Sequence, residues 1–134
     1  MKNFIGLLVF ALVILNANAN PPEEFKEKFR EVNAKCAEES KVDKSELERF
    51  KSGDFAGASP EFKCYSSCFA REMGFIANGE PNTEKMKEVF SKMPKFSEEK
   101  FNRIVNECKS EYTGEDDCEK GFNYMACEKK IMFS

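Results

Sequence analysis

Two cysteines lie four positions apart in the stretch KCYSSCF, residues 63–69. A Cys-x3-Cys pair can hold a metal ion, carry out redox chemistry, or join one helix to two different neighbours. Which of these Cys64 and Cys68 do depends on the compartment, on the remaining cysteines and on the elements that position them.

The number and setting of the cysteines favour disulfides over a metal site. The six cysteines are Cys36, Cys64, Cys68, Cys108, Cys118 and Cys127. An even count in a small exported chain is typical of three disulfides. The chain has no histidine and no Cys-x2-Cys pair, so the usual ligand patterns for zinc are missing. We therefore expect neither a metal nor a cofactor.

The absence of histidine also removes most hydrolytic chemistry. Ser-His-Asp and Cys-His catalysis and His-ligated metal hydrolysis all need an imidazole near neutral pH. An enzyme built from this chain would have to work with carboxylates or lysines alone. Because the chain has 24 acidic residues, some close carboxylate pair is unavoidable and is no sign of catalysis. We identify no catalytic residue and expect that the protein is not an enzyme.

The first twenty residues, MKNFIGLLVFALVILNANAN, have the features of a secretory signal peptide. Lys2 precedes an apolar run from Phe4 to Leu15, and Ala17 and Ala19 form a small-residue cleavage site. The apolar run is too short to span a bilayer. We expect residues 1–19 to be removed and residues 20–134 to form one secreted domain.

The charge of this expected domain excludes one class of partner. Removing the leader takes away Lys2 and no acid, so 20 basic residues face 24 acidic ones, a net charge of −4. The two signs alternate along the chain, so no basic stripe exists for phosphate groups, and we do not expect nucleic-acid binding.

Apolar spacing at the helical period predicts six short helices and an all-α domain. The first covers about 21–38, and the second runs from an Asp43 cap, with Glu46 completing a capping box, to Gly53. The others are expected at about 60–73 behind Ser59, 82–93 before Pro94, 97–108 behind Ser97, and 115–129. Gly121 lies inside the last helix and indicates close packing against a neighbour there.

Helix geometry removes two of the possible cysteine pairs. Cys64 and Cys68 lie one turn apart with nearly parallel Cβ bonds, so each must reach a different element. Cys118 and Cys127 are about 13 Å apart along one helix and face nearly opposite sides. The third and sixth helices are therefore each joined twice to other elements, and the remaining pairings stay open.

The many Phe and Met side chains have two interpretations. They can fill an ordinary core, or they can form an adaptable apolar lining for a ligand. Composition alone does not separate these interpretations.

The spacing C-x27-C-x3-C-x39-C-x9-C-x8-C resembles that of the insect odorant-binding proteins, and KCYSSCFAREMGFIANGEPN is similar to that family's third helix and the turn after it. The resemblance implies a six-helix, disulfide-linked domain that encloses a central apolar cavity. It further implies the pairs Cys36–Cys68, Cys64–Cys118 and Cys108–Cys127. The implied function is carriage of small volatile or lipid-like molecules through extracellular fluid, in olfaction or another chemical sense.

By position in that fold, side chains from helices three to six and from the C-terminal tail are candidates to line the cavity. They are Tyr65, Phe69, Met73, Met86, Phe90, Ile104, Phe122, Tyr124, Met125 and Phe133. Tyr65 and Tyr124 are candidate polar anchors for a ligand hydroxyl or carbonyl, although an ordinary core tyrosine fits each position as well.

The chain departs from the family in how it could release a ligand. Some members use histidines or a long C-terminal tail, whereas this chain has no histidine and only seven residues after Cys127. Any loss of affinity at low pH must therefore come from carboxylates. The apolar residues Ile131, Met132 and Phe133 could lie across the mouth of the cavity as a lid.

Two other functions remain open. A relative of the same fold could carry ligands in saliva, haemolymph or reproductive fluid. A secreted disulfide-rich helical protein could instead bind a protein partner, which predicts a filled core and an exposed apolar patch. Further candidate partners are a membrane odorant receptor and a second copy of the chain.

Overall fold

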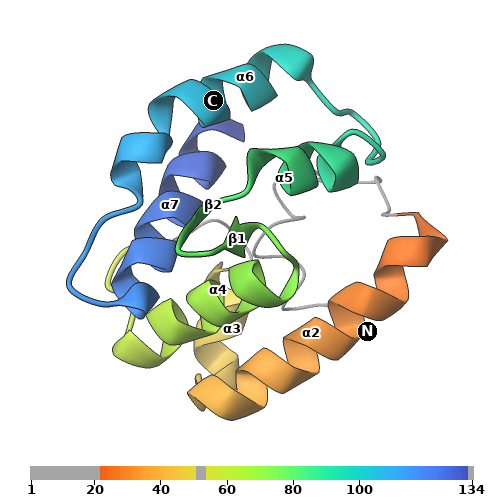
Figure 1. Cartoon of the computed structure of the whole chain (residues 1–134). Coiled ribbons are helices and arrows are strands. Elements are labelled where there is room, and N and C mark those ends of the chain that lie inside the picture. The colour runs from red at the N-terminus through yellow and green to blue at the C-terminus, as the bar shows by residue number, and fades with distance from the viewer. Residues whose placement is uncertain (1–21, 51–53, 133–134) are drawn as a thin grey trace.

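The structure is a computed structural model that describes residues 22–50 and 54–132 (Figure 1). The expected signal peptide, the Gly53 helix stop and Phe133 lie outside the described residues. Within those ranges the chain forms six α-helices, one short 3-10 helix and a hairpin of two very short strands. The predicted all-α, six-helix class is confirmed.

The helices follow one another around a shared core (Figure 1). In chain order they are α2 Glu23–Ser40, α3 Lys44–Phe50, α4 Pro60–Glu72, α5 Thr83–Phe90, α6 Glu98–Glu107, the 3-10 helix η2 Lys109–Glu111, and α7 Asp117–Met132. Helix α7 packs against α4, α6 and η2, and α4 also packs against α2. Helix α7 therefore connects the start of the domain, through α4, with α6 and η2.

Serine side chains start two of the helices where the sequence predicts. The hydroxyl of Ser59 accepts a hydrogen bond from the Phe62 amide at 3.0 Å, and Pro60 follows in the first turn of α4. The hydroxyl of Ser97 accepts one from the Lys100 amide at 3.1 Å at the start of α6. Each bond satisfies an amide that has no partner within its helix.

Only one of the two side-chain hydrogen bonds expected of the predicted capping box of α3 forms. Asp43 does accept a hydrogen bond from the Ser45 amide, at 3.4 Å. Glu46 does not reach back to Asp43, because its carboxylate accepts from both the amide and the hydroxyl of Ser59, at 2.8 Å and 2.5 Å. Glu46 therefore ties α3 to the start of α4 rather than capping its own helix.

Two helix ends differ from the prediction. Helix α5 ends at Phe90 rather than continuing toward Pro94, and tighter turns follow, with the Met93 amide donating to the Phe90 carbonyl at 3.0 Å. Helix α7 runs to Met132 rather than to about residue 129. Ile131 and Met132 form the last turn of this helix, and Ile131 is buried in the core. Their role as a lid stays a prediction.

A small hairpin replaces the turn expected between α4 and α5. Strand β1, Ile76–Ala77, pairs antiparallel with β2, Glu80–Pro81. Asn78 and Gly79 between them both have positive φ, 54° and 77°. An Asn-Gly pair is the usual sequence for a two-residue hairpin turn of this kind. The hairpin could therefore have been predicted from the sequence.

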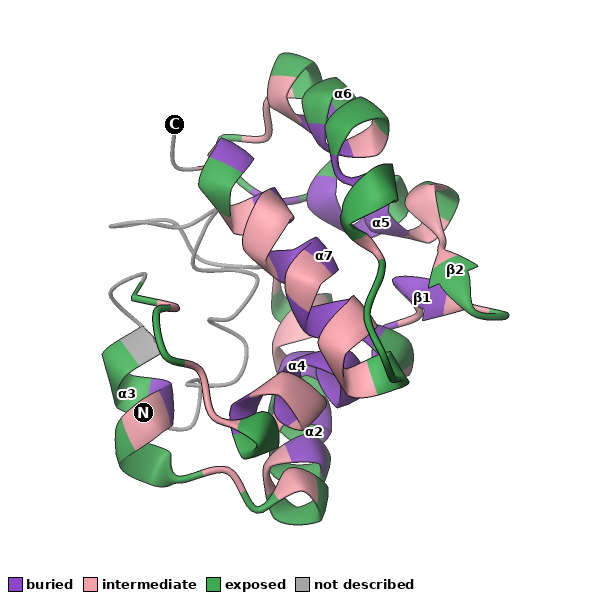
Figure 2. Ribbon diagram, turned by 90° about the vertical axis from the view of Figure 1, so that its left-hand side faces the viewer, coloured by how far each residue is buried: buried purple, intermediate pink, exposed green. Residues whose placement is uncertain are grey.

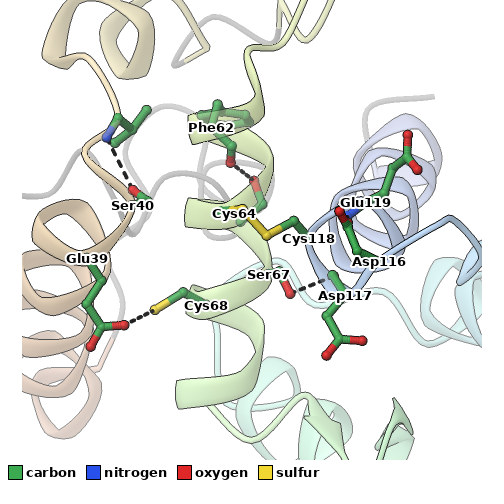
Figure 3. Close-up of a disulfide and its surroundings, with 12 residues drawn as sticks. Glu39, Ser40, Phe62, Cys64, Ser67, Cys68, Asp116, Asp117, Cys118 and Glu119 are labelled. Carbon is green, nitrogen blue, oxygen red and sulfur yellow. Dashed lines mark hydrogen bonds between the residues drawn. A yellow bond between two sulfur atoms is a disulfide. The ribbon is translucent and has the colours of Figure 1, made fainter.

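Three disulfides join the helices. Cys36–Cys68 links α2 to α4, Cys64–Cys118 links α4 to α7, and Cys108–Cys127 links the end of α6 to α7. Figure 3 shows Cys64 and Cys118 joined between α4 and α7. These are the pairs that the family resemblance implies, and α4 and α7 are each joined twice, as helix geometry requires.

Helices α4 and α7 approach each other very closely beside the Cys64–Cys118 disulfide. A Cβ atom on Gly121 would lie 2.8 Å from the Cα atom of Ser67. The Ser67 hydroxyl donates to the Asp117 carbonyl at 2.8 Å, a bond visible in Figure 3. The predicted close packing at Gly121 is confirmed, because no larger residue fits without moving a backbone.

We predict that Gly121→Ala destabilises the folded, disulfide-bonded protein by about 1–3 kcal/mol, because forcing a methyl group between two backbones costs more than the gain in helix propensity. Urea unfolding with the disulfides intact measures the change. Lys28→Ala is the matched control, since Lys28 lies exposed on α2 and its replacement should change stability by less than about 0.5 kcal/mol. Equal stabilities of the two variants would contradict the close approach.

Candidate ligand-binding site

Buried residues, purple in Figure 2, occur on several of the helices. Their aromatic rings form two groups. In one, Phe29 of α2 stacks on Phe69 of α4, and the contacts continue through Tyr65 and Phe62 to Phe122 of α7. The other group lies between the hairpin, α5 and α6, and contains Phe75, Phe90, Phe101 and Phe96. Helix α7 contributes to the first group through Phe122 and contacts α5 through Tyr124.

Nine of the ten residues predicted to line a cavity lie in this core. The buried members are Tyr65, Phe69, Met73, Met86, Phe90, Ile104, Phe122, Tyr124 and Met125. They belong to one continuous cluster of buried side chains. Burial brings these residues together, and their role as ligand contacts stays a prediction; the tenth, Phe133, lies outside the described residues.

Of the two candidate polar anchors, Tyr65 already has a strong partner. It is fully buried on α4, and its hydroxyl donates to the Asn33 side-chain oxygen of α2 at 2.9 Å. A neutral hydrogen bond of this length satisfies the donor. Tyr65 therefore joins α2 to α4 and is the weaker candidate to hold a ligand.

Tyr124 has a much weaker partner. Its hydroxyl lies 3.7 Å from the sulfur of Met86 on α5, and it is only 3% exposed. A thioether sulfur is a poor hydrogen-bond acceptor. The Tyr124 hydroxyl therefore retains most of its capacity to bind an oxygen atom of a ligand.

Glu128 is a buried carboxyl that the sequence interpretation missed. It is 5% exposed on α7, one turn after Tyr124. The buried residues of this part of α7 recur at helical spacing through Tyr124, Met125, Glu128 and Ile131, so the apolar pattern itself places Glu128 on the inner face. That spacing is the signal that could have found it.

Burial changes the titration of these polar groups. Burial raises the pKa of Glu128 from 4.5 to about 8, so its carboxyl is largely protonated at neutral pH. Burial also raises the pKa of the Tyr124 hydroxyl, and the nearby Glu128 carboxyl adds to that rise. The two side chains thus form a pair of polar groups, both neutral near pH 7, within apolar surroundings.

A separate groove of about 580 Å³ opens on the surface between α6, η2 and α7. Its lining mixes charged, polar and apolar side chains: Arg103, Glu107, Glu111, Asn123, Ala126, Cys127, Lys130 and Ile131. None of the ten predicted ligand residues lines this groove. It is therefore a distinct candidate location, which an experiment must separate from the core.

In residues 22–50 and 54–132, no cluster of three acidic or cysteine side chains could hold a metal ion. No helix in the same ranges is long and apolar enough to cross a bilayer.

Comparison with known proteins agrees with the cysteine pattern and the fold. A sequence model described as the PBP/GOBP family matches residues 18–130. General odorant-binding protein 56a of Drosophila melanogaster is 24% identical over 119 residues, covering 89% of this chain and 84% of the fly protein. A solved structure, fatty acid binding protein OBP56a from the oral disk of the blowfly Phormia regina, matches with a TM-score of 0.68 and 29% identity. That match covers 84% of this chain and 95% of the blowfly chain.

We predict that Glu128→Gln stabilises the protein more at about pH 8.5 than at about pH 5. The folded chain keeps a proton that the unfolded chain loses between pH 4.5 and about 8, so the stability of the wild-type protein falls as pH rises through this window. At about 1.4 kcal/mol per pKa unit, the added advantage of the variant is at most about 5 kcal/mol. Urea unfolding at the two pH values measures it.

The matched control is Glu31→Gln, which removes a carboxyl from the exposed face of α2 and should show no comparable change with pH. If Glu128→Gln and Glu31→Gln respond to pH alike, the Glu128 carboxyl is not held in an apolar site.

Proposed function

This chain belongs to the PBP/GOBP family of insect odorant-binding proteins, and from that membership we propose that it is a secreted carrier of long-chain apolar molecules. Proteins of this family carry small hydrophobic ligands and are not enzymes. The proposal adds the class of ligand, the part of the core that receives it and the fluid in which it is carried.

The observation that carries the proposal is a continuous buried core that contains methionine side chains from different helices. Met86 from α5 and Ile104 from α6 are fully buried, and Met125 of α7 is 2% exposed. Methionine side chains repack readily around a guest of irregular shape. Such a core favours a ligand recognised by its length and apolar surface rather than by a fixed set of polar contacts.

The ligand class follows from this core and from the blowfly relative. That protein is named as a fatty acid binding protein, and the likeness to it extends over most of both chains. We infer fatty acids and related long-chain alcohols, aldehydes and esters as ligands of this protein. The predicted residues on α4 to α7 would surround the chain of the ligand, while Tyr124 would meet its oxygen.

Transport outside the cell fits the covalent structure. Three disulfides join the described helices, and such bonds persist mainly in oxidising compartments. Together with the signal peptide expected over residues 1–19, they support secretion into chemosensory fluid or into another body fluid. The membrane receptor and the second copy of the chain stay predictions.

We predict that the delipidated, disulfide-bonded protein, secreted from cells expressing the full chain, takes up an apolar fluorescent probe. Long-chain fatty acids, alcohols and esters should displace the probe at micromolar concentration. Because the chain has no Trp, protein emission leaves the probe signal clear. A folded protein that takes up no probe would contradict the carrier function and would favour a filled core and a protein partner.

Two neighbouring substitutions separate the core from the surface groove. Met125→Phe adds volume on the inner face of α7, whereas Ala126→Phe fills the groove. We expect Met125→Phe to change the affinity for a long-chain ligand by about tenfold and Ala126→Phe to leave it within about twofold. The reverse result would place the ligand in the groove.

A further inference from the structure

Tyr124 and Glu128 form a pair of polar groups on the inner face of α7. They are one helical turn apart, and both are at least nine-tenths buried. Among the described residues, the Tyr124 hydroxyl has only the weak hydrogen bond to Met86 at 3.7 Å. The structure gives Glu128 no hydrogen bond or ion pair with another described residue, and it leaves no fully buried side-chain oxygen among those residues without a partner. The Glu128 carboxyl group therefore keeps a small contact with solvent. A polar group that is largely withdrawn from water and has no strong partner is in an unfavourable environment.

Within residues 22–50 and 54–132, several cations of the neighbouring elements have contacts with groups other than Glu128. Lys63 of α4 lies beside Glu119, and Lys87 of α5 beside Glu98. On α6, Arg103 pairs with Glu107 and Lys100 donates to the Met132 carbonyl at 3.0 Å. Just after η2 the ring of Tyr112 contacts Tyr124, and on α7 itself the Lys129 ammonium lies over the ring of Phe55.

These surroundings determine the chemical form in which Glu128 can act. Burial alone raises the pKa of Glu128, and no charge among the described residues opposes that rise. A protonated carboxyl has an O–H donor, which an ionised carboxylate lacks. Tyr124 supplies a second O–H donor one turn away. Two donors in an apolar core suit a ligand whose head carries an oxygen acceptor, such as a carbonyl or carboxyl group.

We propose that Glu128 and Tyr124 together bind the oxygen-containing head of a long-chain ligand, with Glu128 acting as a protonated hydrogen-bond donor. This rests on the carrier function proposed above. The inner face of α7 around these two residues is then the polar end of the site, and the apolar core receives the chain of the ligand. The proposal also makes affinity fall as pH rises, which is opposite to release on acidification.

The test uses a long-chain methyl ketone, because a ketone head accepts hydrogen bonds and does not titrate. Probe displacement is measured with the secreted, disulfide-bonded protein at pH 6.5 and pH 9. If only the protonated form binds, affinity falls in proportion to the fraction of Glu128 that stays protonated. About one tenth remains protonated at pH 9, so affinity should be about tenfold lower there than at pH 6.5. Circular dichroism at both pH values checks that the protein stays folded.

Three variants assign the pH dependence to named atoms. Glu128→Gln keeps a donor that does not titrate, so its affinity should be the same at both pH values. Glu128→Leu removes the donor and should bind weakly at both. Tyr124→Phe should weaken binding by about threefold to tenfold at pH 6.5 and keep the fall at pH 9. A control, Glu31→Gln on the exposed face of α2, should keep the wild-type profile.

Three results would overturn the proposal in distinguishable ways. If the wild-type protein and all four variants bind the ketone alike at both pH values, the carrier function stands and Glu128 has no role in it. If Glu128→Gln keeps the wild-type fall in affinity, another group titrates. If the ketone displaces no probe under any condition while the protein stays folded, the carrier function itself fails.

Discussion

The close approach of α4 and α7 is the constraint on which the rest of the domain depends. Gly121 leaves room for the backbone at Ser67, and the Cys64–Cys118 disulfide holds the two helices at that distance. The other disulfides attach α2 to α4 and the end of α6 to α7. In the chain-entropy model each bond of this loop size adds about 3–4 kcal/mol. A frame held in this way does not rely on complete filling of its interior, which is the property a carrier needs.

The polar side chains inside this frame divide by what they contact. Tyr65 is bonded to Asn33 and so serves the packing of α2 on α4. Tyr124 and Glu128 have no comparable partner among the described residues, and both lie on the inner face of α7. The structure therefore distinguishes the two buried tyrosines by their hydrogen-bond partners, which the sequence alone does not give. It also adds Glu128, a largely buried carboxyl group whose surroundings disfavour its ionised form.

Local sequence predicted the features that depend on nearby residues. Ser59 and Ser97 start their helices because each serine bonds an amide three residues on. The destination of Glu46 could not be predicted in this way, because its partner Ser59 is thirteen residues away and is brought near only by folding. The end of α5 at Phe90 likewise depends on the turns that bury Met93. Glu128 could have been found from its spacing after Tyr124. Whether the core is open or filled could not, because that depends on the combined volumes of side chains from several helices.

The most direct test of the account is a crystal structure of the delipidated, disulfide-bonded protein with a long-chain fatty acid that carries bromine at the end opposite its carboxyl group. Anomalous scattering locates the bromine independently of the protein atoms. The account predicts that the bromine lies among the buried side chains of α4 and α7 and that the carboxyl group lies beside Tyr124. Bromine in the groove between α6 and α7, or a core filled by its own side chains with no ligand bound, would contradict it.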